Sequence, residues 1–171
     1  MNLNGYTLKA VKMTEVRRGI AYTGNIYYNG KQIGSAHNDG DGGMTFVDLP
    51  PEHRSHDQVL DEEFVERLFT LNDYESLFRE NVPIKPDLGF GGAMVIFNPF
   101  DLDCSLFPKD ETMDEVLTRI RKDNPGREIE SVELFRSLAD FNIDQDHKPE
   151  LYENPAVVGA DEDMDSGITM S

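Results

Sequence analysis

The fold class follows from one stretch of the chain, Ile20-Ala21-Tyr22-Thr23-Gly24-Asn25-Ile26-Tyr27-Tyr28-Asn29-Gly30-Lys31-Gln32-Ile33-Gly34-Ser35-Ala36-His37. Its first half is rich in β-branched and aromatic residues, which favour pleated, half-buried strands. Asn29 and Gly30 both accept the positive φ of a type I′ turn, so the stretch predicts a β-hairpin. Residues 6–13 and 44–49 are expected to add strands on either side. A meander of three or four strands results, and its apolar face needs a cover.

The predicted cover is an amphipathic helix over residues 57–80. Ser55 and Gln58 have the spacing of a capping box, and Asp57 adds negative charge to the first turn. Apolar residues then recur at helical spacing from Leu60 to Phe78. Asn72-Asp73 is the place where this helix could break. Its apolar stripe should pack on the sheet, which leaves a row of carboxylates on the outer face.

The rest of the chain predicts a smaller mixed part. Residues 82–92 are rich in Pro and Gly and indicate a loop, and residues 93–97 indicate a buried strand. Thr112 and Glu115 form a second capping-box pair and begin a helix over residues 112–122. Residues 128–139 fit a helix or an edge strand equally well.

We therefore expect an α+β protein. Residues 1–81 form the meander and its helix, and residues 82–143 form a small mixed α/β part of the same or a second domain. Residues 144–171 form an acidic tail, disordered at its end, because apolar periodicity is lost there.

Charge is distributed unevenly along the chain. Residues 1–56 have a net charge of +1, residues 57–81 of −6, residues 82–126 of −3 and residues 127–171 of −9. A field of this kind repels nucleic acid and anionic membranes, and it attracts basic protein surfaces. Acidity can also serve solubility alone.

Candidate chemical motifs are weak. Asp39-Gly40-Asp41-Gly42-Gly43 lacks the later ligands of a calcium loop, and Asp140 to Leu151 lacks its glycine and its final glutamate. His53 and His56 have a feasible zinc spacing but no third ligand nearby. Nearby aspartates suppress the thiolate of Cys104, the only cysteine. We expect no enzyme activity, no cofactor and no metal site.

A single cysteine, with no apolar targeting or membrane segment, predicts a cytoplasmic protein. A basic-aromatic patch on the sheet remains possible. However, the other segments together carry −18, so we expect no direct binding of nucleic acid. The residues of that patch are Lys9, Lys12, Arg17, Arg18, Tyr22, Tyr27 and Tyr28.

Residues 22–43, YTGNIYYNGKQIGSAHNDGDGG, resemble the N-terminal hairpin of small acidic uncharacterised proteins carried by phages and other mobile elements. This resemblance implies a role in the host cytoplasm as an inhibitor of host defence, of the anti-CRISPR or anti-restriction kind that imitates DNA.

The leading hypothesis is a non-enzymatic binding protein that blocks a basic nucleic-acid-binding protein, such as a host defence nuclease or its complex. The runner-up is a structural or regulatory protein that associates through its sheet edge or through the apolar segment from Phe97 to Phe107. The oligomeric state is left open. The predicted partner-binding residues are carboxylates: Asp57, Asp61, Glu62, Glu63, Glu66, Asp73, Glu75 and Glu80.

Overall fold

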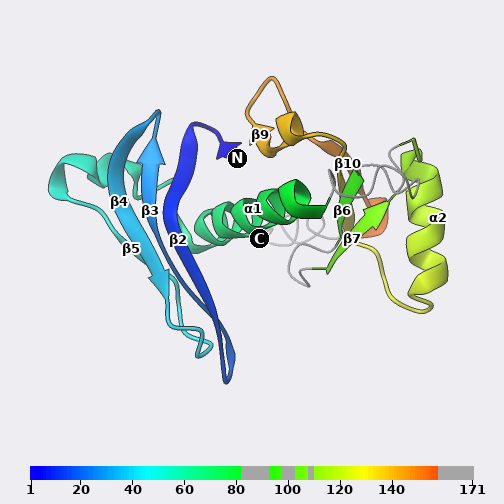
Figure 1. The fold of residues 1–171 in the computed structure, drawn as a ribbon, viewed down its shortest axis with the longest axis horizontal. Helices are drawn as coiled ribbons and strands as arrows, with labels where there is room; N and C mark the ends of the chain where they lie inside the picture. Colours follow the sequence, from blue (N-terminus) through cyan, green and yellow to red (C-terminus); the bar gives the residue numbers. More distant parts are fainter. Residues whose placement is uncertain (82–92, 98–102, 108–109, 158–171) are drawn as a thin grey trace, which may run out of the picture. The chain divides into compact units, whose positions relative to one another are not determined.

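A computed structural model describes residues 1–81, 93–97, 103–107 and 110–157. The chain divides into two compact units (Figure 1). The first comprises Met1–Leu77 and Phe141–His147, and the second comprises Phe78–Asp140 and Lys148–Ser171. The first unit contains a mainly antiparallel sheet, the second an antiparallel sheet, and both contain helical segments, so the predicted α+β class is confirmed.

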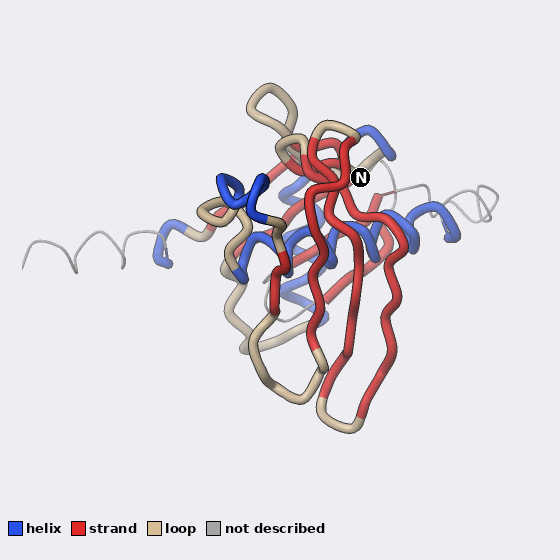
Figure 2. The backbone as a smooth tube through the Cα atoms, turned by 90° about the vertical axis from the view of Figure 1, so that its left-hand side faces the viewer, coloured by secondary structure: helices blue, strands red, loops and turns tan. Residues whose placement is uncertain are grey.

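The first unit is built on a six-stranded sheet. Strands β2 (Tyr6–Val16), β3 (Gly19–Tyr28), β4 (Lys31–Asn38) and β5 (Phe46–Asp48) form the predicted antiparallel meander, and the three long strands lie side by side (Figure 2). Asn29 and Gly30 both have positive φ, 47° and 84°, as the predicted turn requires. Two short strands extend the sheet beyond β2. They are β1 (Asn2–Leu3) and β9 (Asn142–Ile143), which pair in parallel.

A bulge in β2 sets which residues face each side of the sheet. The register shifts between Lys9 and Lys12, and Ala10 adopts a positive φ of 53°. One extra residue in a strand reverses the alternation of side chains beyond it. Before the bulge, Tyr6 and Leu8 are buried, whereas after it Val11 lies against Gly24 on the covered face. This reversal explains why neither face of residues 6–13 is cleanly apolar in the sequence.

Helix α1 (Glu62–Asn81) covers one face of this sheet. The ring of Phe64 lies 5.3 Å from that of Tyr6, and the ring of Phe69 lies 4.2 Å from that of Tyr22. Val65, Leu68, Phe69 and Leu71 are almost fully buried. The helix continues without a break through Asn72 and Asp73.

The predicted start of this helix is wrong. Residues Pro51–His56 form a 3₁₀ helix, and α1 begins only at Glu62. Asp61 is the capping residue, since its Oδ1 accepts a hydrogen bond from the Phe64 amide at 2.8 Å. The Ser55–Gln58 capping box therefore does not begin α1, and the proline at the first position of the preceding segment favours a separate short helix.

The second unit has a four-stranded antiparallel sheet in the order β10 (Glu150–Glu153), β8 (Ser131–Phe135), β6 (Ala93–Phe97) and β7 (Asp103–Phe107). The predicted strand at 93–97 is confirmed. The ambiguous stretch forms a strand at 131–135 and a 3₁₀ helix at Leu138–Phe141. The apolar segment proposed for association, from Phe97 to Phe107, begins at the last residue of β6 and ends with β7. Its residues 98–102 lie outside the described residues, as does the predicted loop at 82–92.

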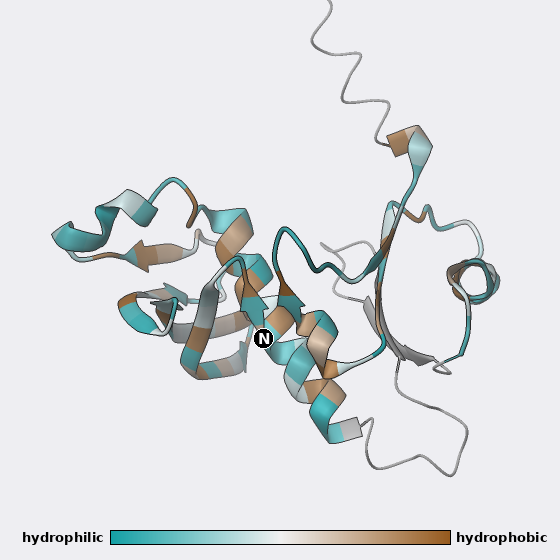
Figure 3. Cartoon of the chain, turned by 90° about the horizontal axis from the view of Figure 1, so that it is seen from above, coloured by the Kyte–Doolittle hydropathy of each residue, from teal (hydrophilic) through white to brown (hydrophobic). Residues whose placement is uncertain are grey.

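Helix α2 (Met113–Asp123) packs on this second sheet. Both hydrogen bonds of the predicted Thr112–Glu115 capping box are present. Figure 3 shows α2 with hydrophobic and hydrophilic residues on different sides. Its apolar side joins a cluster of buried residues: Val116, Leu117, Ile120, Ile129, Val132 and Leu134.

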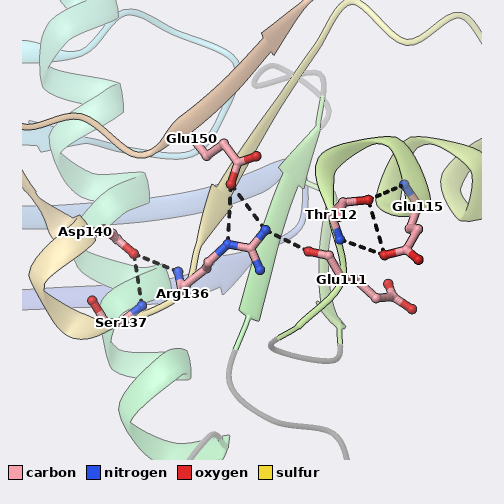
Figure 4. Close-up of polar contacts among 7 residues, drawn as sticks. All are labelled: Glu111, Thr112, Glu115, Arg136, Ser137, Asp140 and Glu150. Atoms are coloured by element: carbon pink, nitrogen blue, oxygen red, sulfur yellow. Dashed lines mark hydrogen bonds and ion pairs between the residues drawn. The ribbon is translucent and has the colours of Figure 1, made fainter.

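Part of the predicted acidic tail has regular structure. Residues 150–153 form β10, which pairs with β8 along four positions. Arg136 ties β10 to the segment that leads into α2: its guanidinium donates to Glu150 Oε2 at 3.2 Å and to the Glu111 carbonyl at 2.7 Å (Figure 4). Asp140 Oδ2 accepts from the Arg136 and Ser137 amides. The part of the predicted tail at 158–171 lies outside the described residues.

Among the described residues, no helix combines the length and the apolar character that crossing a bilayer requires.

Candidate acidic binding surface

Four of the predicted carboxylates share one side of helix α1, and three of them belong to the first unit. Successive residues turn by about 100° around a helix axis, so Glu62, Glu66, Asp73 and Glu80 fall within about 40° of one another. Glu63 lies about 60° further round and is exposed. We call Glu62, Glu66 and Asp73 the acidic stripe. The buried residues Val65 and Leu68 lie outside this arc, but buried Phe69 lies within about 20° of Glu62, so the acidic stripe borders the side of α1 that packs on the sheet.

Glu62, the first residue of the acidic stripe, is hydrogen-bonded to the loop that leads into β5. Glu62 Oε1 accepts a hydrogen bond from the Thr45 amide at 2.9 Å. The Thr45 hydroxyl is in turn bonded to the Tyr22 hydroxyl, and the Asn38 side-chain amide donates to it at 3.1 Å. Glu62 therefore fixes the loop to the helix, in addition to carrying charge.

This polar cluster perturbs two ionisable groups. Burial of its carboxylate, with a smaller contribution from the nearby Glu62 charge, raises the pKa of Glu66 above its ordinary value of 4.5. Burial also raises the pKa of Tyr22, and the hydrogen bond with Thr45 opposes that rise. The folded chain therefore binds a proton at Glu66 more readily than the unfolded chain does.

The other predicted residues are spread over several places. Asp57 is exposed but precedes α1, and Asp61 caps the helix. Glu75 lies on the side of α1 opposite the acidic stripe, where it pairs with the amino group of Met1. Glu80 is exposed in the last turn of α1. The eight carboxylates thus do not form a single row on one helix, because two precede the helix and one turns inward.

Asp73 borders a groove beneath the end of the β2–β3 hairpin. The groove has a volume of about 450 Å³. Met13 and Ile20 are exposed there, because the hairpin extends past the part of the sheet where α1 packs. Its lining residues are Met13, Thr14, Glu15, Val16, Arg17, Gly19, Ile20 and Asp73.

The weak metal motifs have structural roles. Asn38 Oδ1 accepts from the Gly40 amide and Asp41 Oδ1 accepts from the Gly43 amide, as in glycine-rich turns. Asp144 Oδ1 accepts two backbone amides. His56 Nδ1 lies 2.6 Å from the Tyr6 hydroxyl. Within the described ranges, no three His, Cys, Asp or Glu side chains are arranged to hold a metal ion.

The basic-aromatic patch suggested by the sequence is divided between two faces of the sheet. Tyr22 and Tyr28 lie on the face covered by α1, beside Phe69 and His56 respectively. Tyr27 lies on the other face, where Lys9 Nζ is 4.4 Å from the centre of its ring. The alternation of side chains along a strand could have predicted that Tyr27 faces the opposite side from Tyr22 and Tyr28. The bulge in β2, which decides the face on which the lysines lie, could not be located from the sequence.

Comparison of the chain with protein-family models, with curated proteins and with solved structures finds no match.

Proposed function

We propose that this protein is a non-enzymatic binding protein that blocks a basic nucleic-acid-binding protein by presenting carboxylates to its Lys- and Arg-lined groove. A host defence nuclease or its complex, in the cytoplasm of a host cell, is the partner that the phage-like hairpin suggests. The acidic stripe of α1 supports this proposal, together with two exposed carboxylates: Glu63 on the same helix and Asp57 in the segment before it.

The observation that carries the proposal is the spacing of charge along α1. A helix rises about 1.5 Å per residue, so the stripe from Glu62 to Asp73 extends over about 16 Å. A DNA duplex presents one charge per ~1.7 Å of its axis. The helix is therefore less densely charged than DNA, and Asp57 and Glu63 are needed to strengthen its field. Exposed ion pairs are screened by salt, so binding should weaken steeply as salt is raised.

Two exposed carboxylates give the clearest test. Glu62 is unsuitable, because its reversal would leave the Thr45 amide without its acceptor. Asp57 and Glu63 are exposed, so the double variant Asp57→Lys/Glu63→Lys changes charge with little effect on packing. The control is Asp146→Lys/Glu153→Lys, which makes the same charge change at exposed positions elsewhere.

Each protein is immobilised and exposed to a lysate of the host, and captured proteins are eluted by salt and identified by mass spectrometry. We expect the wild type and the control to capture a nucleic-acid-binding protein, to release it with salt and to inhibit its binding of DNA. The Asp57→Lys/Glu63→Lys variant should do none of these. Equal capture and inhibition by both variants would refute the electrostatic mechanism.

A second candidate function is association through a sheet edge, with acidity serving solubility. It is favoured by Leu151, an exposed apolar residue on the edge strand β10. Association of this kind should survive reversal of Asp57 and Glu63 and should be lost on Leu151→Lys.

A further inference from the structure

The face of the first sheet that points away from α1 has its own chemistry. Tyr22 and Gly24 of β3 contact Phe69 of α1, so the alternate residues Thr23, Asn25 and Tyr27 point to the opposite side. Residues paired across strands share a face, and the register therefore adds residues from β2, β4 and β5. We call this set the open sheet face: Thr7, Lys9, Lys12, Thr23, Asn25, Tyr27, Gln32, Ser35, His37, Phe46 and Asp48.

Two lysines and three rings lie on this face: Lys9, Lys12, Tyr27, His37 and Phe46. Lys9 Nζ lies 4.4 Å from the centre of the Tyr27 ring. Phe46 is 55% exposed and stacks on His37, with ring centres 5.2 Å apart and planes 19° apart. Lys12 is also exposed and is paired with Thr23, which is itself opposite His37. Tyr27 is half-buried and Phe46 is exposed, so this face presents aromatic surface close to its two lysines.

Charge on this part of the chain is opposite to that of the rest. Residues 1–38 contain five Lys or Arg and a single acidic residue, Glu15, for a net charge of +4. The remaining residues therefore carry −21. At physiological salt the Debye length is about 8 Å, so distant carboxylates act only weakly on a ligand bound at the open sheet face. Asp48, at the β5 end of the open sheet face, is an acidic residue that the register places on it, opposite Ser35.

We propose that the open sheet face binds single-stranded nucleic acid. Such strands are bound where cations follow the backbone and aromatic side chains stack on successive bases. Tyr27 and His37 are separated by four positions in register, which is about 13 Å along the strands. A stacked strand advances about 3.4 Å per nucleotide, so the face accommodates about four nucleotides. An acidic peptide would use the lysines, but it would leave Tyr27 and Phe46 without a role.

This inference goes beyond the proposed function, because it uses the opposite face of the first unit and the opposite sign of charge. It also departs from the expectation that the protein does not bind nucleic acid directly. That expectation is drawn from net charge, and net charge includes residues far from this face. A protein with both surfaces could hold a nucleoprotein target by its protein and its nucleic acid together.

The test uses fluorescence anisotropy with the full chain and a labelled oligothymidylate of about 16 nucleotides, the upper range for a single-strand binding fold. Lys12→Glu should weaken binding by about tenfold and reduce the dependence on salt, since a phosphate contact is lost. Phe46→Ala should weaken binding by at least about fivefold, as expected when a stacked base loses its ring. Both positions are exposed, so neither change disturbs the core.

The matched control is Lys31→Glu. It makes the same charge change in the same sheet, but Lys31 is paired with Tyr28, on the face toward α1. The proposal is supported if Lys31→Glu leaves binding unchanged while Lys12→Glu and Phe46→Ala weaken it as stated. Equal loss in Lys31→Glu and Lys12→Glu, no binding of the oligonucleotide, or tighter binding of polyglutamate would overturn it. The Asp57→Lys/Glu63→Lys variant should bind the oligonucleotide at least as well as the wild type, so this test and that of the proposed function can fail separately.

Discussion

Gly40 is a position where a single added methyl group should strongly destabilise the first unit. It is buried in the loop between β4 and β5 and has a positive φ of 71°. A Cβ there would lie 2.5 Å from the Ala21 nitrogen and 2.7 Å from the Ile20 carbonyl carbon. These atoms belong to the backbone of β3, which cannot move aside as a flexible side chain can. Gly40→Ala must therefore separate the loop from the hairpin.

Gly42 provides the matched control two residues away. It also has a positive φ, 88°, but a Cβ there would meet nothing within 4 Å. Gly42→Ala should cost about 1–2 kcal/mol for the left-handed conformation alone. Gly40→Ala has the same conformational cost and adds an overpacking cost of about 1–3 kcal/mol. Both variants gain equally from the lower entropy of their unfolded chains, so this term cancels in the comparison.

Urea unfolding followed by tyrosine fluorescence measures this difference. Five of the six tyrosines lie in the first unit, so the signal reports mainly on its unfolding. We expect Gly40→Ala to lower the free energy of unfolding by about 1–3 kcal/mol more than Gly42→Ala does. Equal unfolding midpoints for the two variants would show that the loop is not held against β3 as the structure has it.

Two further changes test charge and capping. Because the folded state raises the pKa of Glu66, it binds the proton more tightly than the unfolded chain, and stability should fall as pH rises from about 4.5 through the raised value. Glu66→Gln should therefore raise the melting temperature at pH 7 and lose this advantage near pH 4, whereas Glu63→Gln should have little effect at either pH. Thr112→Ala removes the cap of α2 and should destabilise the second unit by about 1 kcal/mol, measured by circular dichroism during urea unfolding. Thr118→Ala, at an exposed position inside the same helix, should be neutral or slightly stabilising.

Oppositely charged faces on one unit change how the acidity of the chain should be interpreted. Net charge describes the field far from the molecule, whereas a bound partner meets only the residues within about a Debye length. The acidic stripe and the open sheet face are therefore best tested as separate surfaces, each with variants that leave the other unchanged.

The sequence alone determined the features that depend on neighbouring residues. The Asn29-Gly30 turn, the strands around it and the Thr112–Glu115 capping box follow from local backbone and hydrogen-bonding preferences. These preferences act within a few residues and so can be read from short stretches. The α+β class follows from the same signals, because alternation and helical periodicity are also local.

Only the tertiary structure decided which residues share a surface. The bulge near Ala10 sets which lysines face away from α1, and the parallel pairing of β1 with β9 brings residues 142–143 to the N-terminal sheet. Asp61 rather than Ser55 begins α1, and Glu62 and Glu75 are drawn into contacts with Thr45 and Met1. The physical reason is that registers and long-range contacts are selected by packing over the whole unit, where one inserted residue changes the face of every residue beyond it.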